Sequence, residues 1–127
     1  MAPVVARFGR DRRIRKSSEF ENVLKTGSRG STDHVTVTIA TARFPGRLGV
    51  SAPAKSGNAV KRNKARRRVR DYYRHAFAHA SPYDVVVNIR AGFSDLSPEK
   101  AKETLDVAVS KALSHRKRSG DRIHHRH

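Results

Sequence analysis

Hydrophobic and polar positions alternate along the segment HVTVTIAT, residues 34–41. An alternation of period two predicts a β-strand with one apolar and one polar face. The next such segment, RLGVSAPA, covers residues 47–54 and follows a Pro45-Gly46 pair that predicts a turn. The two segments indicate an antiparallel strand pair, and Pro53 is expected to end the second strand or to place it at a sheet edge. The apolar positions are Val35, Val37, Ile39, Leu48, Val50 and Ala52.

A third segment, YDVVVNIR at residues 83–90, is almost continuously apolar rather than alternating. A short β-branched run of this kind is typical of a strand that is buried on both faces. The segment therefore predicts a buried strand.

Helical spacing marks the two ends of this pattern. A first helix is predicted at residues 17–27, SSEFENVLKTG, because apolar residues fall at i, i+3 and i+4. Ser18 and Glu21 have the spacing of a capping box at its start. Gly27 stands where a residue in the left-handed conformation would end the helix. Near the C-terminus, Ser97 is a good N-cap with Pro98 at the first helical position. The apolar positions of the first helix are Phe20, Val23 and Leu24, and those of the last are Ala101, Leu105, Ala108 and Ala112.

A central helix is predicted from about residue 59 to about residue 79. Asn58 is a good N-cap for it, and Ser81-Pro82 is expected to end it. Its apolar stripe fades toward the N-terminus, where Arg62 lies in the same sector. The first two turns are thus expected to project beyond the core, because unpaired buried charge is prohibitive. The stripe contains Ala65, Val69, Tyr72, Tyr73 and Ala76, with Phe77 at its margin.

The predicted order of elements is α-β-β-α-β-α. It indicates an α+β fold, a two-layer α/β sandwich on a small mixed sheet of about four strands, of the kind found in ribosomal proteins. We expect one α/β domain at residues 17–115, between a mobile basic arm at residues 1–16 and a basic, disordered tail at residues 116–127.

The distribution of charge along the chain indicates what kind of ligand the protein binds. The 127 residues carry a net charge of +17, with a pI near 11.5 and a mean hydropathy of −0.71. Lys and Arg outnumber the acids by six to one in residues 1–16, nine to one in residues 55–74 and six to one in residues 111–127, which leaves the remainder close to neutral. Clustered cations on a neutral body are typical of a polyanion binder.

Composition also excludes several classes of protein. The chain has no Cys, which rules out disulfides and thiolate zinc sites and fits a reducing compartment. It has no apolar run of about 18 residues, so we expect no membrane span, and the N-terminal apolar run is too short for a signal peptide.

The central helix begins with the densest cluster, since seven of the ten residues 61–70 are Lys or Arg. Cations at a helix N-terminus oppose the macrodipole, each by up to about 1 kcal/mol. A bound phosphate would relieve this conflict, because free backbone N–H groups and cations both favour an anion there. Asn63, the one uncharged polar residue of the cluster, can bond a base, a ribose or a phosphate.

The segment GNAVKRNKARRRVRDYYRHAF, residues 57–77, resembles the signature of the bacterial ribonuclease P protein subunit, A-V-x-R-N-R-x-K-R-x-x-R. Lys64 stands where the signature has Arg, and Arg66 stands where it has Lys, so both exchanges preserve the charge. The order of elements over residues 12–115 is also similar to the family's. The positions that match directly are Ala59, Val60, Arg62, Asn63, Arg67 and Arg70.

This resemblance implies a protein that binds a large catalytic RNA and assists removal of the 5′ leader from precursor tRNA in the cytoplasm. It implies that the RNA with its bound Mg²⁺ performs the hydrolysis, and that the protein supplies no catalytic residue, no metal ligand and no organic cofactor. It places RNA binding on Lys61, Arg62, Asn63, Lys64, Arg66, Arg67 and Arg70. It places the leader in a cleft formed with Phe20, Leu24, Thr36, Thr38 and Lys55, although further aromatics that the family usually has near Leu24 and Thr38 are absent.

Other functions remain to be weighed against this one. A metal nuclease needs clustered carboxylates, which the sequence lacks, while His75 and His79 at i, i+4 could form an acid–base or zinc pair but more simply lie on the surface. His124, His125 and His127 are expected in a flexible basic end rather than a metal site. The main alternative is a ribosomal-protein-like structural RNA binder without enzymatic function. DNA binding comes third, because no helix-turn-helix partner precedes the basic helix.

Overall fold

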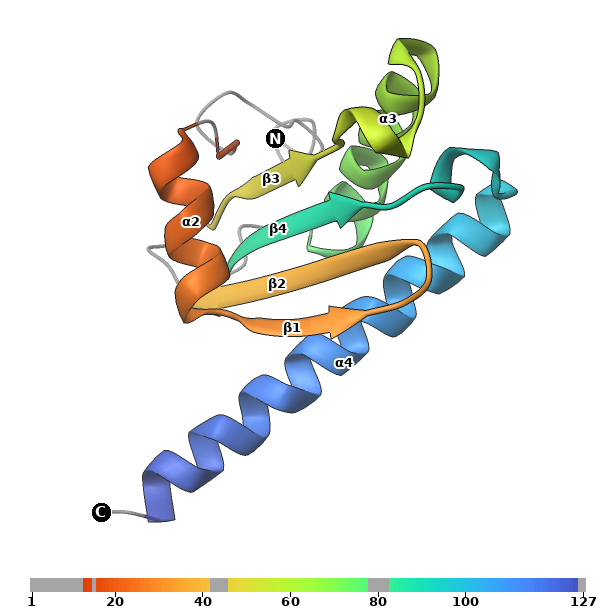
Figure 1. The fold of residues 1–127 in the computed structure, drawn as a ribbon. Helices are drawn as coiled ribbons and strands as arrows, with labels where there is room; N and C mark the ends of the chain where they lie inside the picture. Colours follow the sequence, from red (N-terminus) through yellow and green to blue (C-terminus); the bar gives the residue numbers. More distant parts are fainter. Residues whose placement is uncertain (1–12, 15, 42–45, 78–82, 126–127) are drawn as a thin grey trace, which may run out of the picture.

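The computed structural model describes residues 13–14, 16–41, 46–77 and 83–125, with only the backbone described in 116–125. Four strands form one sheet, with α3 and α4 behind it and α2 across one end of its front (Figure 1). The helices are α2 (Ser17–Thr26), α3 (Ala59–Ala76) and α4 (Pro98–His125). The strands are β1 (Ser28–Ser31), β2 (Val35–Thr41), β3 (Leu48–Ser51) and β4 (Tyr83–Ile89), with short 3-10 helices η2 (Ala54–Ser56) and η3 (Phe93–Asp95).

The sheet has the order β1-β2-β4-β3 and is mixed. β2 pairs antiparallel with β1 and with β4, whereas β3 runs parallel to β4. The expected antiparallel pairing of the 34–41 and 47–54 segments is therefore wrong, because β4 lies between them. The physical reason is that the apolar β4 gains burial on both faces at the centre, and α3 supplies the long crossover that a parallel pair requires.

β1 is the strand that the hydrophobic pattern did not predict. Its sequence, SRGS, has no apolar alternation, and it forms as the short return arm of a hairpin with β2. Gly30 is needed there because a side chain would overlap the Ala108 carbonyl and lie 2.6 Å from the Ala112 nitrogen of α4. The strand is thus defined by how closely a helix approaches it rather than by its own hydrophobicity.

The main core lies between the sheet and the two helices behind it. The predicted apolar face of β2 is buried there, as is the predicted stripe of α4. From α3 the core takes Ala65, Val69 and Tyr73, while Ala76 is exposed, contrary to the sequence prediction, because it lines a groove between α3 and α4. β4 is buried along most of its length, which confirms the predicted buried strand.

The starts of α3 and α4 were predicted well and the start of α2 poorly, while α3 ends at Ala76 rather than near residue 79. Asn58 Oδ1 accepts a bond from Lys61 N at 2.9 Å, and Ser97 Oγ accepts one from Lys100 N at 3.2 Å. The predicted Ser18–Glu21 capping box is wrong: the N-cap is Lys16, two residues earlier, and Glu19 accepts from Lys16 N. Gly27 is extended (φ −89°) rather than left-handed, because it passes close to Thr38 of β2.

The chain is already attached to the sheet at Arg13, four residues before the expected domain boundary. Arg13 forms a parallel bridge with Leu48, and Ile14 N donates to Leu48 O at 2.8 Å. Ile14 is buried in a second, smaller cluster with Val23 beneath α2. The rest of the expected arm, residues 1–12 and 15, lies outside the described residues.

At the other end, α4 continues as a helix to His125. Ala112 is the last buried residue among the side chains of α4 that the structure describes, and the final turns project beyond the sheet, as Figure 1 shows. That residues 116–127 are disordered in solution stays a prediction.

Candidate nucleic-acid interface

The basic segment folds as the exposed side of α3. Ala65 and Val69 are almost fully buried against the sheet and fix the orientation of the helix. All seven predicted RNA-binding residues therefore lie outside the core, four exposed and three half-buried. This set, called the α3 basic surface below, comprises Lys61, Arg62, Asn63, Lys64, Arg66, Arg67 and Arg70.

One flank of this surface faces the edge strand β3. Arg62 Nε donates to the Ala52 carbonyl at 2.7 Å, which ties the first turn of α3 to the end of that strand. Farther along, burial lowers the pKa of Arg70, and the charges of Arg13 and Arg66 lower it further. Three guanidinium groups from two separate segments thus lie close enough to repel one another, an arrangement that an anion would stabilise.

The other flank faces η3 and the start of α4. Arg68 Nη1 donates to the Leu96 carbonyl at 2.5 Å, and Lys61 Nζ lies 3.3 Å from a carboxylate oxygen of Asp95. The list of RNA-binding residues taken from the family signature leaves out Arg68. The density of charge in residues 61–70 is the signal that could have included it.

The α3 basic surface has few acidic neighbours. Apart from Lys61, none of its cations makes an ion pair with a carboxylate of the described residues. The first turn of α3 contains no acidic residue, so the helix dipole and the side chains attract anions together. Val60 in that turn is 76% exposed, which adds an apolar contact to the same end.

The predicted leader cleft lies on the opposite face of the sheet, beside α2. Phe20 and Leu24 are half-buried between α2 and the sheet, and the Phe20 ring covers Gly49, where an added Cβ would lie 2.8 Å from it. Thr36 is half-buried on β2 with its Oγ1 3.1 Å from Ser31 Oγ. Figure 1 shows that no helix covers the other end of this face.

The other two residues predicted for the cleft, Thr38 and Lys55, do not lie on this exposed face. Thr38 is 0% exposed beneath Gly27, so in this structure it packs under the predicted cleft and offers no surface to a ligand. Lys55 is exposed in η2, beyond the end of β3. The structure thus brings Phe20, Leu24 and Thr36 to one face and leaves Lys55 at its margin.

An arginine between two carboxylates holds α2 in place over this face. Arg47 Nη1 lies 2.9 Å from Glu19 Oε2 of α2, and its backbone N–H donates to Asp84 Oδ1 at 2.9 Å. The hydrogen bond that Arg47 donates to Glu19 raises the pKa of Arg47 against a smaller opposing effect of burial. The clamp therefore fixes the distance between α2 and the sheet.

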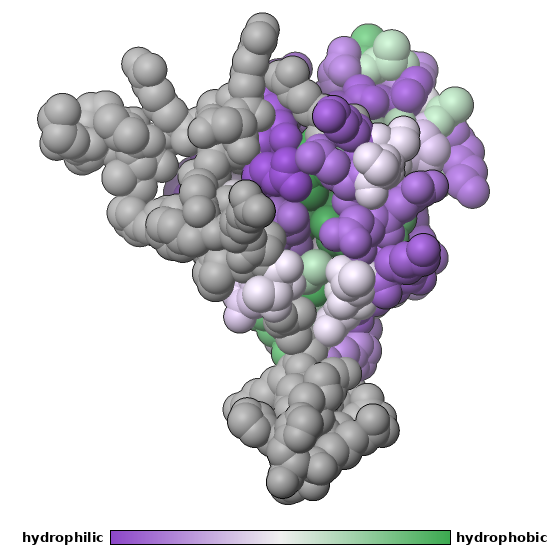
Figure 2. Space-filling model, turned by 90° about the vertical axis from the view of Figure 1, so that its left-hand side faces the viewer, coloured by the Kyte–Doolittle hydropathy of each residue, from purple (hydrophilic) through white to green (hydrophobic). Residues whose placement is uncertain are grey.

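Ionisable residues outside these two surfaces are dispersed. No group of three or more His, Cys, Asp or Glu in the described part of the chain could hold a metal ion. His75 Nδ1 lies 2.7 Å from the Asp71 carbonyl oxygen, whereas His79 lies outside the described residues, so the structure does not test that pair. Within the described residues no helix is both long and apolar enough to cross a membrane. Viewed from the side on which Figure 1 places α2, the described surface is mainly hydrophilic (Figure 2).

Comparison with known proteins identifies relatives of this arrangement. The sequence model of the family Ribonuclease P matches residues 8–113. A ribonuclease P protein component from Syntrophobacter fumaroxidans is 34% identical over 110 residues, covering 84% of this chain and 92% of the relative. Among solved structures, the Staphylococcus aureus RNase P protein has a TM-score of 0.71 at 27% identity over 78% of this chain and 93% of its own. The Thermotoga maritima RNase P protein has a TM-score of 0.63 at 26% identity, covering 73% and 90%.

Fold and surface together define a basic α+β RNA-binding domain whose cationic helix is carried on a four-stranded mixed sheet. Within that class, the matched segment and the relatives agree on one assignment. The chain belongs to the bacterial ribonuclease P protein family. It has the function of that family, the protein component of a ribonucleoprotein enzyme that works together with ribonuclease P RNA, rather than that of a ribosomal-protein-like structural RNA binder.

Proposed function

We propose that this chain binds the RNA subunit of its ribonuclease P through the α3 basic surface. One observation carries the proposal: the seven predicted RNA-binding residues all stay outside the core on a helix that Ala65 and Val69 fix against the sheet. Most of their charges have no acidic partner within the described chain. A folded RNA supplies phosphates at the required density, and the helix N-terminus orients them.

In this proposal the protein is an accessory and the RNA is the catalyst. The basic surface would repel a divalent cation, so the RNA and not this surface would hold Mg²⁺, whose chemistry there would be to activate water and stabilise a leaving oxygen. The protein's own contribution is to neutralise phosphates. It thereby lowers the Mg²⁺ concentration that the folded RNA requires. We place this activity in the cytoplasm, where precursor tRNA is processed.

The substrate in this proposal is precursor tRNA, with its single-stranded 5′ leader on the face beside α2. Phe20 offers an aromatic edge there, Leu24 an apolar neighbour and Thr36 a hydroxyl on the open sheet. Lys55 adds a cation at the margin. Polar and aromatic groups of this kind suit an unpaired strand, whose bases stack and whose phosphates pair with cations.

Reconstitution with the cognate RNA tests the proposed function. At low Mg²⁺, adding the protein is expected to accelerate removal of the leader from precursor tRNA by the RNA. The protein alone, freed of RNA and treated with chelator, is expected to cleave nothing. Cleavage by the RNA-free protein, or a rate that the protein does not change at any Mg²⁺ concentration, would contradict it.

A further inference from the structure

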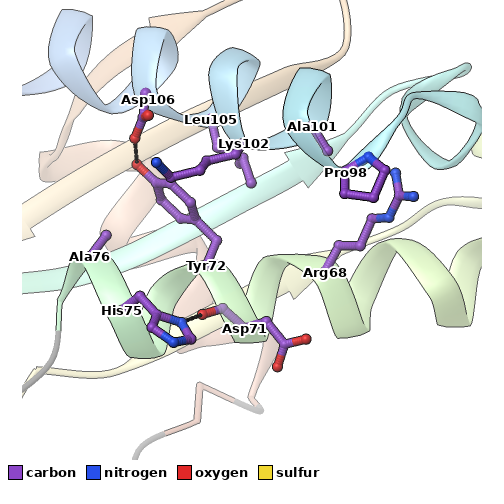
Figure 3. A pocket seen from close by; sticks show the side chains of 10 residues that line it. All are labelled: Arg68, Asp71, Tyr72, His75, Ala76, Pro98, Ala101, Lys102, Leu105 and Asp106. Atoms are coloured by element: carbon purple, nitrogen blue, oxygen red, sulfur yellow. Dashed lines mark hydrogen bonds between the residues drawn. The ribbon is translucent and has the colours of Figure 1, made fainter.

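A groove separates the second half of α3 from the start of α4 (Figure 3). Its volume of about 560 Å³ falls in the range of small-molecule sites, roughly 300–1,000 Å³. The groove exists because the facing residues are small: Ala76 on α3 and Ala101 on α4 leave space that larger side chains would fill. Leu105 and Pro98 complete an apolar lining.

The polar groups at the groove are held in place by the protein itself. Tyr72 reaches from α3 to α4 and its hydroxyl donates to Asp106 Oδ1 at 2.7 Å, as Figure 3 shows. Burial, and then the bond to Asp106, raise the pKa of Tyr72, so its hydroxyl stays a neutral donor. Because both ends of the side chain are fixed, the ring forms a rigid aromatic wall.

Charge at the groove favours an anion at its rim. Lys102 is exposed beside the Tyr72 ring, and Arg68 stands at the other end with one guanidinium nitrogen committed to the Leu96 carbonyl. Of the two carboxylates, Asp71 pairs with Arg74 and Asp106 accepts from the neutral Tyr72 hydroxyl, and neither forms an ion pair with Lys102 or Arg68. The two cations therefore remain available for a phosphate.

The groove is also continuous with the α3 basic surface. Lys61, Lys64 and Arg68 follow one another at i, i+3 and i+7, which places them on one face of the helix. Tyr72 and His75 continue that face and line the groove. An RNA strand bound along the first turns of α3 thus reaches the groove without leaving the helix.

We propose that the α3–α4 groove binds one unpaired nucleotide of the RNA that occupies the α3 basic surface, with its base against Tyr72 and its phosphate between Arg68 and Lys102. The proposal rests on the proposed function and adds a second contact to it. Stacking on one aromatic ring, by the effect of alanine substitutions, is worth roughly tenfold in affinity.

A matched pair of lysines tests the phosphate contact. Lys102 and Lys100 are both exposed on α4, but Lys100 lies near Thr32 and His34 on the other flank. Lys102→Ala is expected to weaken binding of the RNA subunit and to reduce the salt slope of that binding by about one unit, and Lys100→Ala to do neither. Equal effects of the two substitutions would overturn the phosphate contact.

Filling the groove tests the base. Ala76 is exposed, so Ala76→Leu adds its methyl groups to the groove and not to the core. The variant is expected to lose about tenfold in RNA affinity with an unchanged salt slope and melting temperature, whereas Ala91→Leu, at an exposed alanine beyond β4, should bind like the parent protein.

Chemical probing of the bound RNA supplies a second measurement that does not depend on the stability of the variant. One unpaired nucleotide is expected to be protected by the parent protein and by Ala91→Leu but not by Ala76→Leu. Identical protection by all three proteins, with equal affinities, would overturn the inference and leave the groove to a protein partner. Failure of the parent protein to bind the RNA at all would instead contradict the proposed function.

Discussion

Single arginines on α3 differ in what holds them. Arg62 and Arg68 each donate to a backbone carbonyl at opposite flanks of the helix, so each has a structural contact besides any contact with RNA. Arg67 is exposed on the side away from the core, and no ion pair joins it to a carboxylate of the described residues. A substitution at Arg67 therefore reports on RNA binding with the least effect on folding.

We expect Arg67→Ala to weaken binding to the RNA subunit and to lower the magnitude of the salt slope by about one unit, because one phosphate contact is lost. The measurement is RNA affinity at several salt concentrations. Arg90→Ala, which removes an exposed arginine at the far end of β4, is the control and should leave the slope unchanged. An unaltered slope for Arg67→Ala would show that Arg67 makes no phosphate contact.

At the scale of elements, α4 closes the edge of the sheet that β1 would otherwise leave open. Lys111 Nζ donates to the Ser31 carbonyl at 3.0 Å, and His115 Nδ1 donates to the Arg29 carbonyl at 2.7 Å. These side chains occupy carbonyl groups that an unprotected edge would offer to another strand. Between them, Gly30 lets the helix backbone approach the strand directly.

Gly30→Ala is expected to destabilise the protein by about 1–3 kcal/mol or more, because the new methyl group meets helix backbone that cannot rotate away. Urea denaturation gives the change in the free energy of unfolding. Ser28→Ala, at a partly exposed position of the same strand, should cost far less. A Gly30→Ala variant as stable as the parent would mean that α4 does not pack this closely on β1 in solution.

The contact between α2 and the sheet leads to a prediction about substrate. Phe20→Ala removes the ring above Gly49, and we expect it to weaken precursor tRNA binding by the holoenzyme more than mature tRNA binding, since only the precursor has a leader. The measurement compares the two dissociation constants. Equal losses would assign Phe20 to the core beneath α2 instead, as its half-buried position also allows.

The elements that the sequence predicted are those whose own residues carry the signal. β2, β4 and the stripe of α4 were predicted because each has an apolar period or run, and α3 because Asn58 caps it. β1 has no such signal, and the pairing of β3 depends on competition between strands, which local periodicity does not express.

The candidate site follows the same division. Charge density placed the basic residues outside the core, as the structure confirms for α3. Burial of Thr38 depends on the path of Gly27 above it, and the groove depends on how α3 and α4 lie side by side. Neither can be inferred from the spacing of residues in one segment.

The whole molecule combines a lean core with a large excess of positive charge. The chain of 127 residues has a net charge of +17, and only 36% of its residues are hydrophobic. Burial lowers the pKa of Arg70, and the nearby charges of Arg13 and Arg66 lower it further. Self-repulsion of this kind opposes compact folding, and any polyanion that binds the folded state preferentially offsets it.

Sulfate is therefore expected to raise the melting temperature of the free protein. Thermal unfolding would be followed by circular dichroism with sodium sulfate and with sodium chloride at matched ionic strength, so that general screening is subtracted. The sulfate series should give the larger increase because a divalent anion binds clustered cations. Superimposable curves in the two salts would argue against anion-linked folding.

The position of β4 in the middle of the sheet also has a consequence for how the chain is made. Among the described strands, β3 pairs only with β4, and β2 pairs with β4 on the edge that β1 does not occupy. β4 is nevertheless the last of these strands to be synthesised. The sheet is therefore held together by contacts between residues distant in sequence, which slows folding relative to a local hairpin design. During translation α3 emerges before β4, the strand that completes the sheet on which α3 packs. The basic helix is therefore exposed to RNA in the cell before the domain beneath it is complete.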